Sequence, residues 1–214
     1  MTTDNRHKLL DINAPYRRAF EVLRSGGIVA LPTDTVYGLV AVAADRPAVK
    51  RVYEAKARDP DQPLPVFVFS AEQAELIAEL NDVARRLMER FWPGALTVVL
   101  RKKPSFETRA VAGGDTIGLR APRDAVLREL ASQLGPLTGT SANIAGRAAC
   151  HTADEVRAQL GHAVDLIVDA PIDAIARPST IVDCTDPARV RVLREGAVAR
   201  EALVEALAGE TELV

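Results

Sequence analysis

Apolar positions along the chain follow two spacings, and Gly and Pro residues separate the segments that carry them. Apolar residues three or four positions apart predict amphipathic helices. These segments lie at about 15–24, 46–58, 71–80, 81–91, 124–134, 152–161 and 200–209. Short apolar runs predict strands at about 27–33, 64–69, 95–102, 116–122, 164–170, 179–185 and 189–195. Their irregular alternation, with adjacent late strands, predicts one α/β domain whose mixed sheet is flanked by helices.

One predicted helix carries a cation on its apolar stripe. Asp45 can cap this helix, and Val49 and Val52 mark its buried face. The next position on that face is Lys56, and Arg58 follows it just before an Asp-Pro pair. One interpretation is a cation that complements the helix dipole, with its stem on the core and its head in water. The other is a pair of cations in a cleft that binds phosphate or carboxylate.

Composition places the chain among ordinary globular proteins. Its 214 residues, 48% of them hydrophobic and 26% charged, suffice for a sizeable core in one large domain or two small ones. The net charge of −2 argues against a protein that coats DNA. The longest apolar run, VYGLVAVAA, is too short to cross a bilayer, and the polar start MTTDNRHKLLD lacks the apolar segment of a signal peptide. We therefore expect no membrane partner.

The cysteines and histidines argue against a zinc site. Cys150 and Cys184 form no CxxC motif, and the three histidines are scattered along the chain. We therefore predict no metal bound by the protein itself. The sparse cysteines also favour a reducing, cytoplasmic setting.

A first polar stretch, LPTDTVYGL at 31–39, follows a predicted buried strand directly. It contains Thr33, Thr35 and Tyr37, together with Asp34. Loops at strand ends are where α/β sheets bind ligands. The alternative is a turn in which the Thr and Asp side chains satisfy their own backbone.

A second polar stretch, TGTSANIAG at 138–146, follows a strand that begins near residue 136. Thr140, Ser141 and Asn143 offer small polar groups between two glycines, which let the backbone approach a ligand. The serine-hydrolase pattern G-x-S-x-G fails here, because Asn143 stands at its last position. A plain turn that leads to the cap of the next helix is the alternative.

A third polar stretch combines RPSTIVD with VLREG near the end of the chain. Ser179 and Thr180 open one predicted strand, and Arg194 ends the next. An edge strand with an ordinary surface arginine is the alternative. The sequence has no Walker A loop and no GxGxxG motif, so a nucleotide here needs a different cradle.

Taken together, these stretches resemble the YrdC family of L-threonylcarbamoyladenylate synthases in order and spacing. The resemblance extends from about Gly26 to Gly196. It is carried by PTDTVYGL, the K-x-R pair Lys56 and Arg58, WPGALTVVL, GLRAP, the S-x-N pair Ser141 and Asn143, PSTIVD and LREG. The chain is similar to the short, single-domain form: one domain over 1–214, with a core at about 13–200, a polar N-terminal tail and a C-terminal helix.

The resemblance implies a twisted α/β sheet with a positively lined concave cleft. It also implies a nucleotidyltransferase that combines L-threonine, bicarbonate and ATP into threonylcarbamoyl-AMP and pyrophosphate. Mg²⁺ would arrive with ATP. The product would supply a downstream threonylcarbamoyl transferase complex that modifies certain tRNAs.

The same resemblance implies roles for single residues. Lys56 and Arg58 would be catalytic and would contact phosphate and carboxylate oxygens. The nucleotide would be bound by Lys56, Thr140, Ser141, Asn143 and Arg194. Threonine or its carbamate would be bound by Thr33, Thr35, Tyr37, Arg58, Arg120 and Ser179.

The chain departs from the family pattern at several positions, among them LRAP and LREG, where VRVP and LRPG are commoner. Phe67 stands where many members have His, and Ala145 replaces a frequent Ser. Pro65, in the predicted strand at 64–69, removes a donor from the sheet and indicates an edge strand or a bulge.

Two other functions stay open. One is a module of the same fold that binds structured RNA in ribosome maturation; the other is a carbamoyl-transferring accessory domain.

Overall fold

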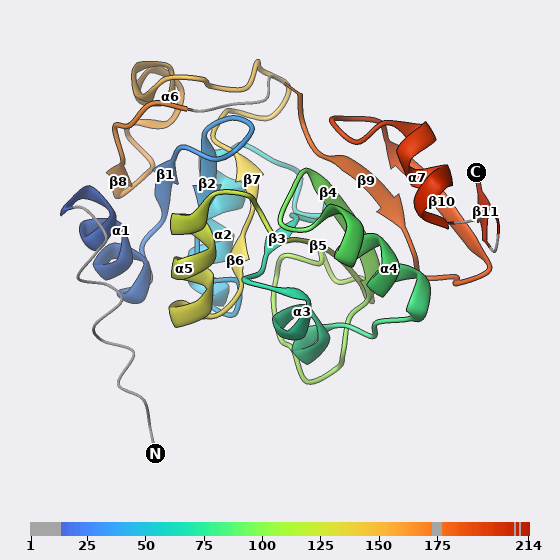
Figure 1. Ribbon diagram of the computed structural model, residues 1–214. Helices are drawn as coiled ribbons and strands as arrows, with labels where there is room; N and C mark the ends of the chain where they lie inside the picture. The colour runs from blue at the N-terminus through green and yellow to red at the C-terminus, as the bar shows by residue number, and fades with distance from the viewer. Residues whose placement is uncertain (1–13, 173–176, 208, 210) are drawn as a thin grey trace.

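The computed structural model describes residues 14–172, 177–207, 209 and 211–214 and has helices packed around two β-sheets (Figure 1). The helices are α1 (Ala14–Arg24), α2 (Arg46–Ala55), α3 (Ala71–Ile77), α4 (Asp82–Phe91), α5 (Ala125–Leu134), α6 (Ala153–Leu160) and α7 (Arg200–Leu207). The strands are β1 (Val29–Leu31), β2 (Gly38–Val40), β3 (Val66–Phe67), β4 (Leu96–Arg101), β5 (Thr116–Arg120), β6 (Leu137–Thr138), β7 (Thr140–Ser141), β8 (Leu166–Ile167), β9 (Thr180–Asp183), β10 (Arg189–Arg194) and β11 (Glu212–Leu213).

Both sheets are mixed. The smaller has the order β7-β2-β1-β8, with β8 parallel to β1, and the larger has the order β11-β10-β9-β4-β5-β3-β6. In the larger sheet β4 runs parallel to β9 and antiparallel to β5. The predicted mixed α/β class is therefore confirmed, with the strands divided between two sheets. The predicted N-terminal tail lies outside the described residues, and the single-domain assignment stays a prediction.

The two sheets meet at Gly139, the single residue between β6 and β7. A Cβ atom on Gly139 would lie 2.6 Å from a ring carbon of Phe67, a separation that real contacts do not reach. Glycine therefore lets the chain pass against the Phe67 ring as it leaves one sheet and enters the other. This crossing places the polar residues of β7 beside the ends of strands from the larger sheet.

The prediction that Pro65 marks an edge strand or a bulge is wrong. β3 pairs with β5 on one side and β6 on the other, in an unbroken register. Pro65 directly precedes Val66, the first paired residue of β3, so the ladder needs no donor from it. Its carbonyl accepts a hydrogen bond of 2.7 Å from the Gly139 backbone N–H.

The core is divided between two clusters of buried side chains. The smaller cluster joins Leu23 of α1 and Leu31 of β1 to Leu127 and Leu130 of α5, so α1 and α5 cover one side of the smaller sheet (Figure 1). The larger cluster fills the space around β4, β5, β9 and α2. Each large apolar side chain buried in this way contributes roughly 1.5–3 kcal/mol.

Helix starts show capping chemistry, as predicted for Asp45. The Asp45 carboxylate accepts a hydrogen bond of 3.0 Å from Ala48 N, which fixes the start of α2. Thr152 and Glu155 form the capping box of α6.

Among the described residues, every helix is too short or too polar to span a lipid bilayer.

Candidate functional site

A cavity of about 410 Å³ lies where the two sheets meet. The loop that links β1 to β2, the strand β7 and the ends of β5, β9 and β10 contribute to its wall. The predicted site residues that line it are Thr33, Thr35, Arg58, Arg120, Thr140, Ser141, Ser179 and Arg194. Lys56, Tyr37 and Asn143 do not line it. The structure therefore brings most of the widely separated predicted residues to one place.

The loop after β1 is held together by the Thr33 hydroxyl. Thr33 Oγ1 donates to Val36 O at 2.7 Å and accepts from Thr35 N at 3.1 Å. The Thr35 hydroxyl lies 3.1 Å from Thr33 Oγ1. The self-satisfied turn considered as the alternative is therefore present for the Thr side chains, whereas the Asp34 carboxylate bonds Arg120 and the Arg123 N–H instead. The turn coexists with the cavity, because Thr33 and Thr35 also line its wall.

Tyr37 is packed away from the cavity. Its side chain is buried, and its hydroxyl lies 2.8 Å from Ala170 O and 3.2 Å from Val168 O. Burial raises the pKa of Tyr37. This side chain ties the loop after β1 to the segment after β8, and the geometry gives no support for contact with threonine.

Lys56 is buried directly behind the loop that carries the S-x-N pair. Its side chain is 2% exposed, and its ammonium donates to Asn143 O at 2.6 Å and to Ser141 O. Burial is the main reason that the pKa of Lys56 falls to about 8, and the nearby charge of Arg58 adds to the shift. The prediction that Lys56 lies on the buried stripe is confirmed, and the residue itself caps the end of α2.

Arg58 follows a backbone kink. Ala57 has a φ of 45°, in the left-handed region that disfavours alanine. Arg58 then donates to the carbonyls of Gln62 at 3.2 Å and Pro63 at 3.0 Å. These bonds hold the guanidinium at the rim of the cavity.

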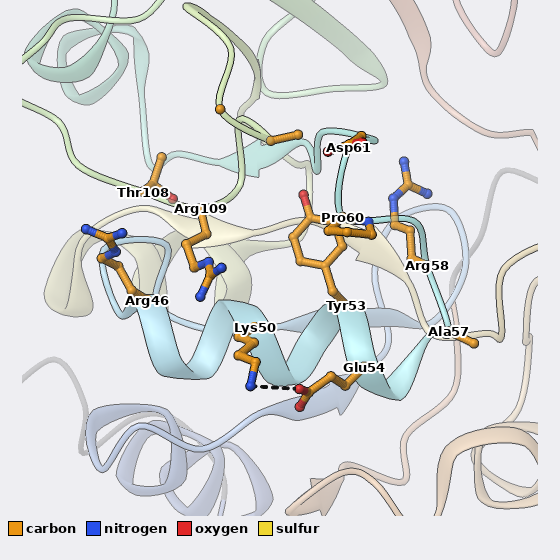
Figure 2. A pocket seen from close by; sticks show the side chains of 12 residues that line it. Arg46, Lys50, Tyr53, Glu54, Ala57, Arg58, Pro60, Asp61, Thr108 and Arg109 are labelled. Carbon is orange, nitrogen blue, oxygen red and sulfur yellow. Dashed lines mark ion pairs between the residues drawn. The ribbon is translucent and has the colours of Figure 1, made fainter.

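Arg58 also lines a second, larger cavity of about 700 Å³, between α2 and the loop at 108–113 (Figure 2). Arg46, Lys50 and Arg109 supply further cations, and Lys50 is paired with Glu54 at 3.1 Å. No other predicted site residue lines this space.

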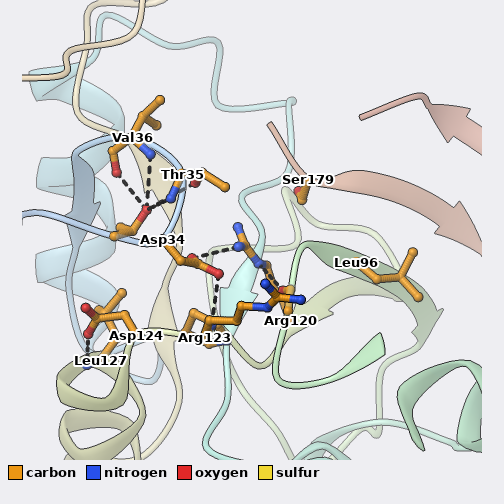
Figure 3. A network of polar contacts seen from close by, with 12 residues as sticks. Asp34, Thr35, Val36, Leu96, Arg120, Arg123, Asp124, Leu127 and Ser179 are labelled. Atoms are coloured by element: carbon orange, nitrogen blue, oxygen red, sulfur yellow. Dashed lines mark hydrogen bonds and ion pairs between the residues drawn. The ribbon is translucent and has the colours of Figure 1, made fainter. Parts of the chain in front are cut away.

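Arg120 is anchored on two sides beneath the first cavity. Its Nε donates to Gly94 O at 2.7 Å, and its Nη2 lies 2.7 Å from Asp34 Oδ1 (Figure 3). The side chain is almost fully buried. Burial lowers the pKa of Arg120, while the charge of Asp34 opposes that change.

Arg194 joins the same wall through Ser179. Its guanidinium donates to Ser179 O at 2.8 Å and to Ser179 Oγ at 3.0 Å. Burial lowers the pKa of Arg194. Ser179 Oγ lies 3.0 Å from Thr97 Oγ1, which also lines the cavity. Sequence reasoning missed Thr97, although it lies within the family-like stretch WPGALTVVL.

Asn143 has an acceptor without a partner. Its Nδ2 donates to Ile144 O at 2.9 Å and Arg147 O at 2.7 Å, which fixes the orientation of the amide. Its Oδ1 is buried and has no hydrogen-bond partner among the described residues. A buried acceptor of this kind costs free energy unless a donor reaches it.

The chemistry of the cavity is cationic and rich in hydroxyl groups. Its lining includes three guanidinium groups and no Asp or Glu. Among the described residues, no group of three or more His, Cys, Asp or Glu could hold a metal ion. Guanidinium groups bind phosphate and carboxylate in two-point contacts, and hydroxyls complete such contacts.

Comparison with known proteins shows which family the chain matches. Residues 21–196 match the family model of Sua5, YciO and YrdC proteins, whose description reads "Telomere recombination". The chain belongs to the Sua5/YciO/YrdC family. The predicted family resemblance is thereby confirmed over nearly the same residues.

Relatives within the Sua5/YciO/YrdC family carry a consistent name. Putative threonylcarbamoyl-AMP synthases from Mycobacterium leprae and Methanocaldococcus jannaschii are 40% and 35% identical to the chain. The first match covers 88% of this chain and 86% of the relative, and the second covers 89% and 92%.

Solved structures of the family share the fold. P. abyssi Sua5 complexed with L-threonine matches with a TM-score of 0.85 and 36% identity over 93% of this chain. The chain spans 58% of the length of that Sua5 chain. E. coli YciO matches with a TM-score of 0.77 and 26% identity, over 88% of this chain and 92% of its own. These neighbours confirm the predicted YrdC-like fold.

Proposed function

We propose that this chain is a threonylcarbamoyl-AMP synthase, a nucleotidyltransferase that joins L-threonine, bicarbonate and ATP. The observation that carries the proposal is the convergence of three guanidinium groups and several hydroxyls on one cavity without a lining carboxylate. The names of the relatives support it, as does the Sua5 structure that contains L-threonine. The product would be consumed by a threonylcarbamoyl transferase that modifies tRNA.

The reaction brings anions together, which explains the demand for fixed positive charge. The threonine amine and bicarbonate form a carbamate, in which an N–C bond is made and water leaves. The carbamate then attacks the α-phosphorus of ATP through a carboxylate oxygen. An O–P bond forms, the bond to the bridging oxygen breaks, and pyrophosphate leaves with that electron pair. Positioning and electrostatic stabilisation dominate such transfers, so no covalent nucleophile is required.

The nucleotide phosphates would lie against Arg58, Arg194, Thr140 and Ser141. Neither arginine has a carboxylate partner among the described residues, so both charges are available to a polyanion. The hydroxyls of Thr140 and Ser141 come from β7, which the Gly139 crossing brings to the cavity. Arg58 would also bind the carbamate, because its guanidinium lies at the rim of the same cavity.

Threonine would bind near Arg120, Thr35 and Ser179. The guanidinium of Arg120 is held from behind and lines the cavity, which suits it to a carboxylate. Thr33 would support the loop through its internal hydrogen bonds, and Tyr37 would anchor that loop from the core.

Lys56 would act through the loop that it holds rather than by touching a phosphate. Its ammonium binds the carbonyls on both sides of Ala142, so it fixes Ser141 in the wall and adds a positive charge behind it. Asn143 would contribute to the same loop through the carbonyls that its amide binds.

Mg²⁺ would enter with the nucleotide. The cavity lining offers hydroxyls and guanidinium groups but no carboxylate, and this donor set does not fit a divalent cation held by the protein. The triphosphate oxygens would therefore supply the ligands that such an ion prefers.

The direct test is an incubation with ATP, bicarbonate and L-threonine, followed by mass detection of the adenylate and measurement of pyrophosphate. We expect pyrophosphate release that depends on threonine, with serine as the matched control amino acid. Release that is equal with and without threonine contradicts the proposal.

Binding of structured RNA is the second candidate function. The larger cavity favours it, because Arg58 and Arg109 line that groove and neither has a carboxylate partner among the described residues (Figure 2). RNA binding through phosphates depends on salt. A hairpin RNA that binds with the same affinity at low and high salt, or equally to Arg109→Ala, would exclude this surface.

A further inference from the structure

Asp34 forms a buried ion pair directly behind the cavity wall. Its Oδ1 lies 2.7 Å from Arg120 Nη2, and its Oδ2 accepts a hydrogen bond of 2.9 Å from Arg123 N (Figure 3). The side chains of Asp34 and Arg120 are 10% and 5% exposed. Arg120 lines this cavity and Asp34 does not, so the carboxylate can act on a ligand in this cavity only through the arginine. Asp34 instead lines a separate space of about 460 Å³ together with Arg123 and Asp124.

The Arg120 guanidinium has few remaining degrees of freedom. Gly94 O accepts from Nε at 2.7 Å, Asp34 holds Nη2, and the Phe67 ring centroid lies 5.9 Å from the guanidinium carbon. Nη1 has no hydrogen-bond partner among the described residues. A guanidinium fixed in this way presents its free nitrogen in one direction and loses little entropy when a ligand binds.

The three cavity arginines differ in charge compensation. Asp34 offsets the charge of Arg120, whereas Arg58 and Arg194 donate to carbonyl or hydroxyl oxygens and have no carboxylate partner among the described residues. A compensated guanidinium attracts a phosphate less than an uncompensated one and still offers directed hydrogen bonds. This division suits a zwitterion at Arg120 and a polyanion at the other two.

We propose that Asp34 is a positioning and specificity-determining residue, which holds Arg120 for an amino-acid carboxylate and disfavours phosphate there. The inference rests on the proposed function, because it assigns the Arg120 side of the cavity to threonine. Arg120 would then discriminate between the two anions in two ways: it donates hydrogen bonds to the amino-acid carboxylate, and Asp34 reduces the positive charge that would attract phosphate.

The test compares Asp34→Asn with Asp165→Asn, a matched control outside the cavity. Asp165 also pairs with an arginine, Arg51 at 2.8 Å, and accepts from a backbone N–H, that of Ile28, at 2.7 Å. Isothermal titration of the full chain measures the Kd of threonine and of ATP. A second series titrates threonine against increasing inorganic phosphate.

For Asp34→Asn we expect threonine to bind about tenfold more weakly, with the Kd of ATP within about twofold of the wild type. Inorganic phosphate should compete with threonine at about tenfold lower concentration than in the wild type. Asp165→Asn should leave the Kd of threonine, the Kd of ATP and the competing phosphate concentration unchanged, even if it lowers Tm as much as Asp34→Asn does. Threonine and phosphate values equal to those of the wild type, or equal losses for threonine and ATP, overturn the inference.

Two further measurements separate the inference from its premise. If Asp34→Asn does not fold, Asp34→Glu keeps the charge but moves it by one methylene, and unaltered threonine binding then overturns the inference. If the wild type binds no threonine, the proposed function fails. The Arg120 Nη2–H resonances then decide whether Asp34 holds the side chain, because Nη2 is the donor to Asp34. They should exchange with solvent faster in Asp34→Asn, and an unchanged rate overturns the positioning role.

Discussion

At the scale of single residues, the cations of the site differ in their surroundings. Lys56 is buried with two carbonyl partners and Arg120 has a carboxylate, whereas the described residues offer Arg194 only the oxygens of Ser179. Neither interpretation of Lys56 is correct as stated, because the ammonium neither reaches water nor lines the cavity with Arg58. Its stem packs on the core, and its ammonium, instead of reaching water, binds the loop of the cavity.

The pH dependence of the reaction should report the charge on Lys56. Because its pKa is about 8 in the folded chain, the ammonium is charged at pH 7 and is lost as the pH rises above 8. We expect threonine-dependent pyrophosphate release to fall above about pH 8 in the wild type. Lys56→Met should be slower by roughly 10²-fold, the scale of a lost electrostatic stabiliser, and should lack this decline. A wild-type profile that stays flat to pH 9.5 excludes the role.

The free energy of unfolding should rise as Lys56 loses its proton, whereas the reaction rate should fall. The pKa of Lys56 is lower in the folded chain than the 10.5 of a free lysine, so the unfolded chain binds more protons between these values. The stability of the wild type relative to Lys56→Met should therefore rise by about 2 kcal/mol from pH 7 to 9.5. Urea unfolding at both pH values measures this difference, and a fall would contradict the assignment.

Ala57 offers a test of the backbone between the two cations. Its φ of 45° costs an alanine about 1 kcal/mol that a glycine does not lose. Ala57→Gly should therefore raise the free energy of unfolding by about that amount and preserve activity, because Lys56 and Arg58 keep their contacts. Ala55→Gly, in the last turn of α2, is the matched control and should destabilise instead.

At the scale of elements, the site is assembled where strands end and where one sheet passes into the other. The loop after β1, the end of β5 and the start of β9 each supply one part of the cavity wall. The passage from β6 to β7 supplies another, and it exists because Gly139 tolerates the Phe67 ring.

Gly139→Ala should disturb both packing and the site. The added methyl group would overlap the Phe67 ring, and overpacking of this kind costs roughly 1–3 kcal/mol. We expect lower stability and weaker ATP binding, since β7 carries Thr140 and Ser141. Phe67→Leu in the same chain should restore part of the stability. Gly118→Ala, whose new Cβ meets its nearest neighbour at 3.4 Å, is the control and should be well tolerated.

At the scale of the whole molecule, the sequence predicts which segments form helices and strands better than where they meet. Local periodicity and capping residues such as Asp45 and Thr152 locate the helices, because these signals lie within a few residues. β2, β7 and β11 were not predicted as strands, and Thr140 and Ser141 of β7 were placed in a polar loop. The apolar run from Val36 shows no alternation, and β11 has only two residues, whose pairing with β10 no local pattern encodes.

The site shows the same limit. The motifs indicated which residues belong together through family resemblance, and the structure gathers most of them around one cavity. Their partners could not be predicted. Lys56 binds carbonyls 85 and 87 residues away, and Asp34 pairs with an arginine 86 residues away. Tyr37 has a site-like position in the motif, yet its hydroxyl is taken up by carbonyls of a distant segment.

One cavity between the two sheets should hold both the nucleotide and the amino acid. A crystal structure with L-threonine and a non-hydrolysable ATP analogue tests it most directly. We expect the phosphates against Arg58 and Arg194, and the threonine carboxylate on Arg120, all within the cavity of about 410 Å³. Either ligand located instead in the larger cavity between α2 and the loop at 108–113, away from Arg120 and Arg194, would contradict it.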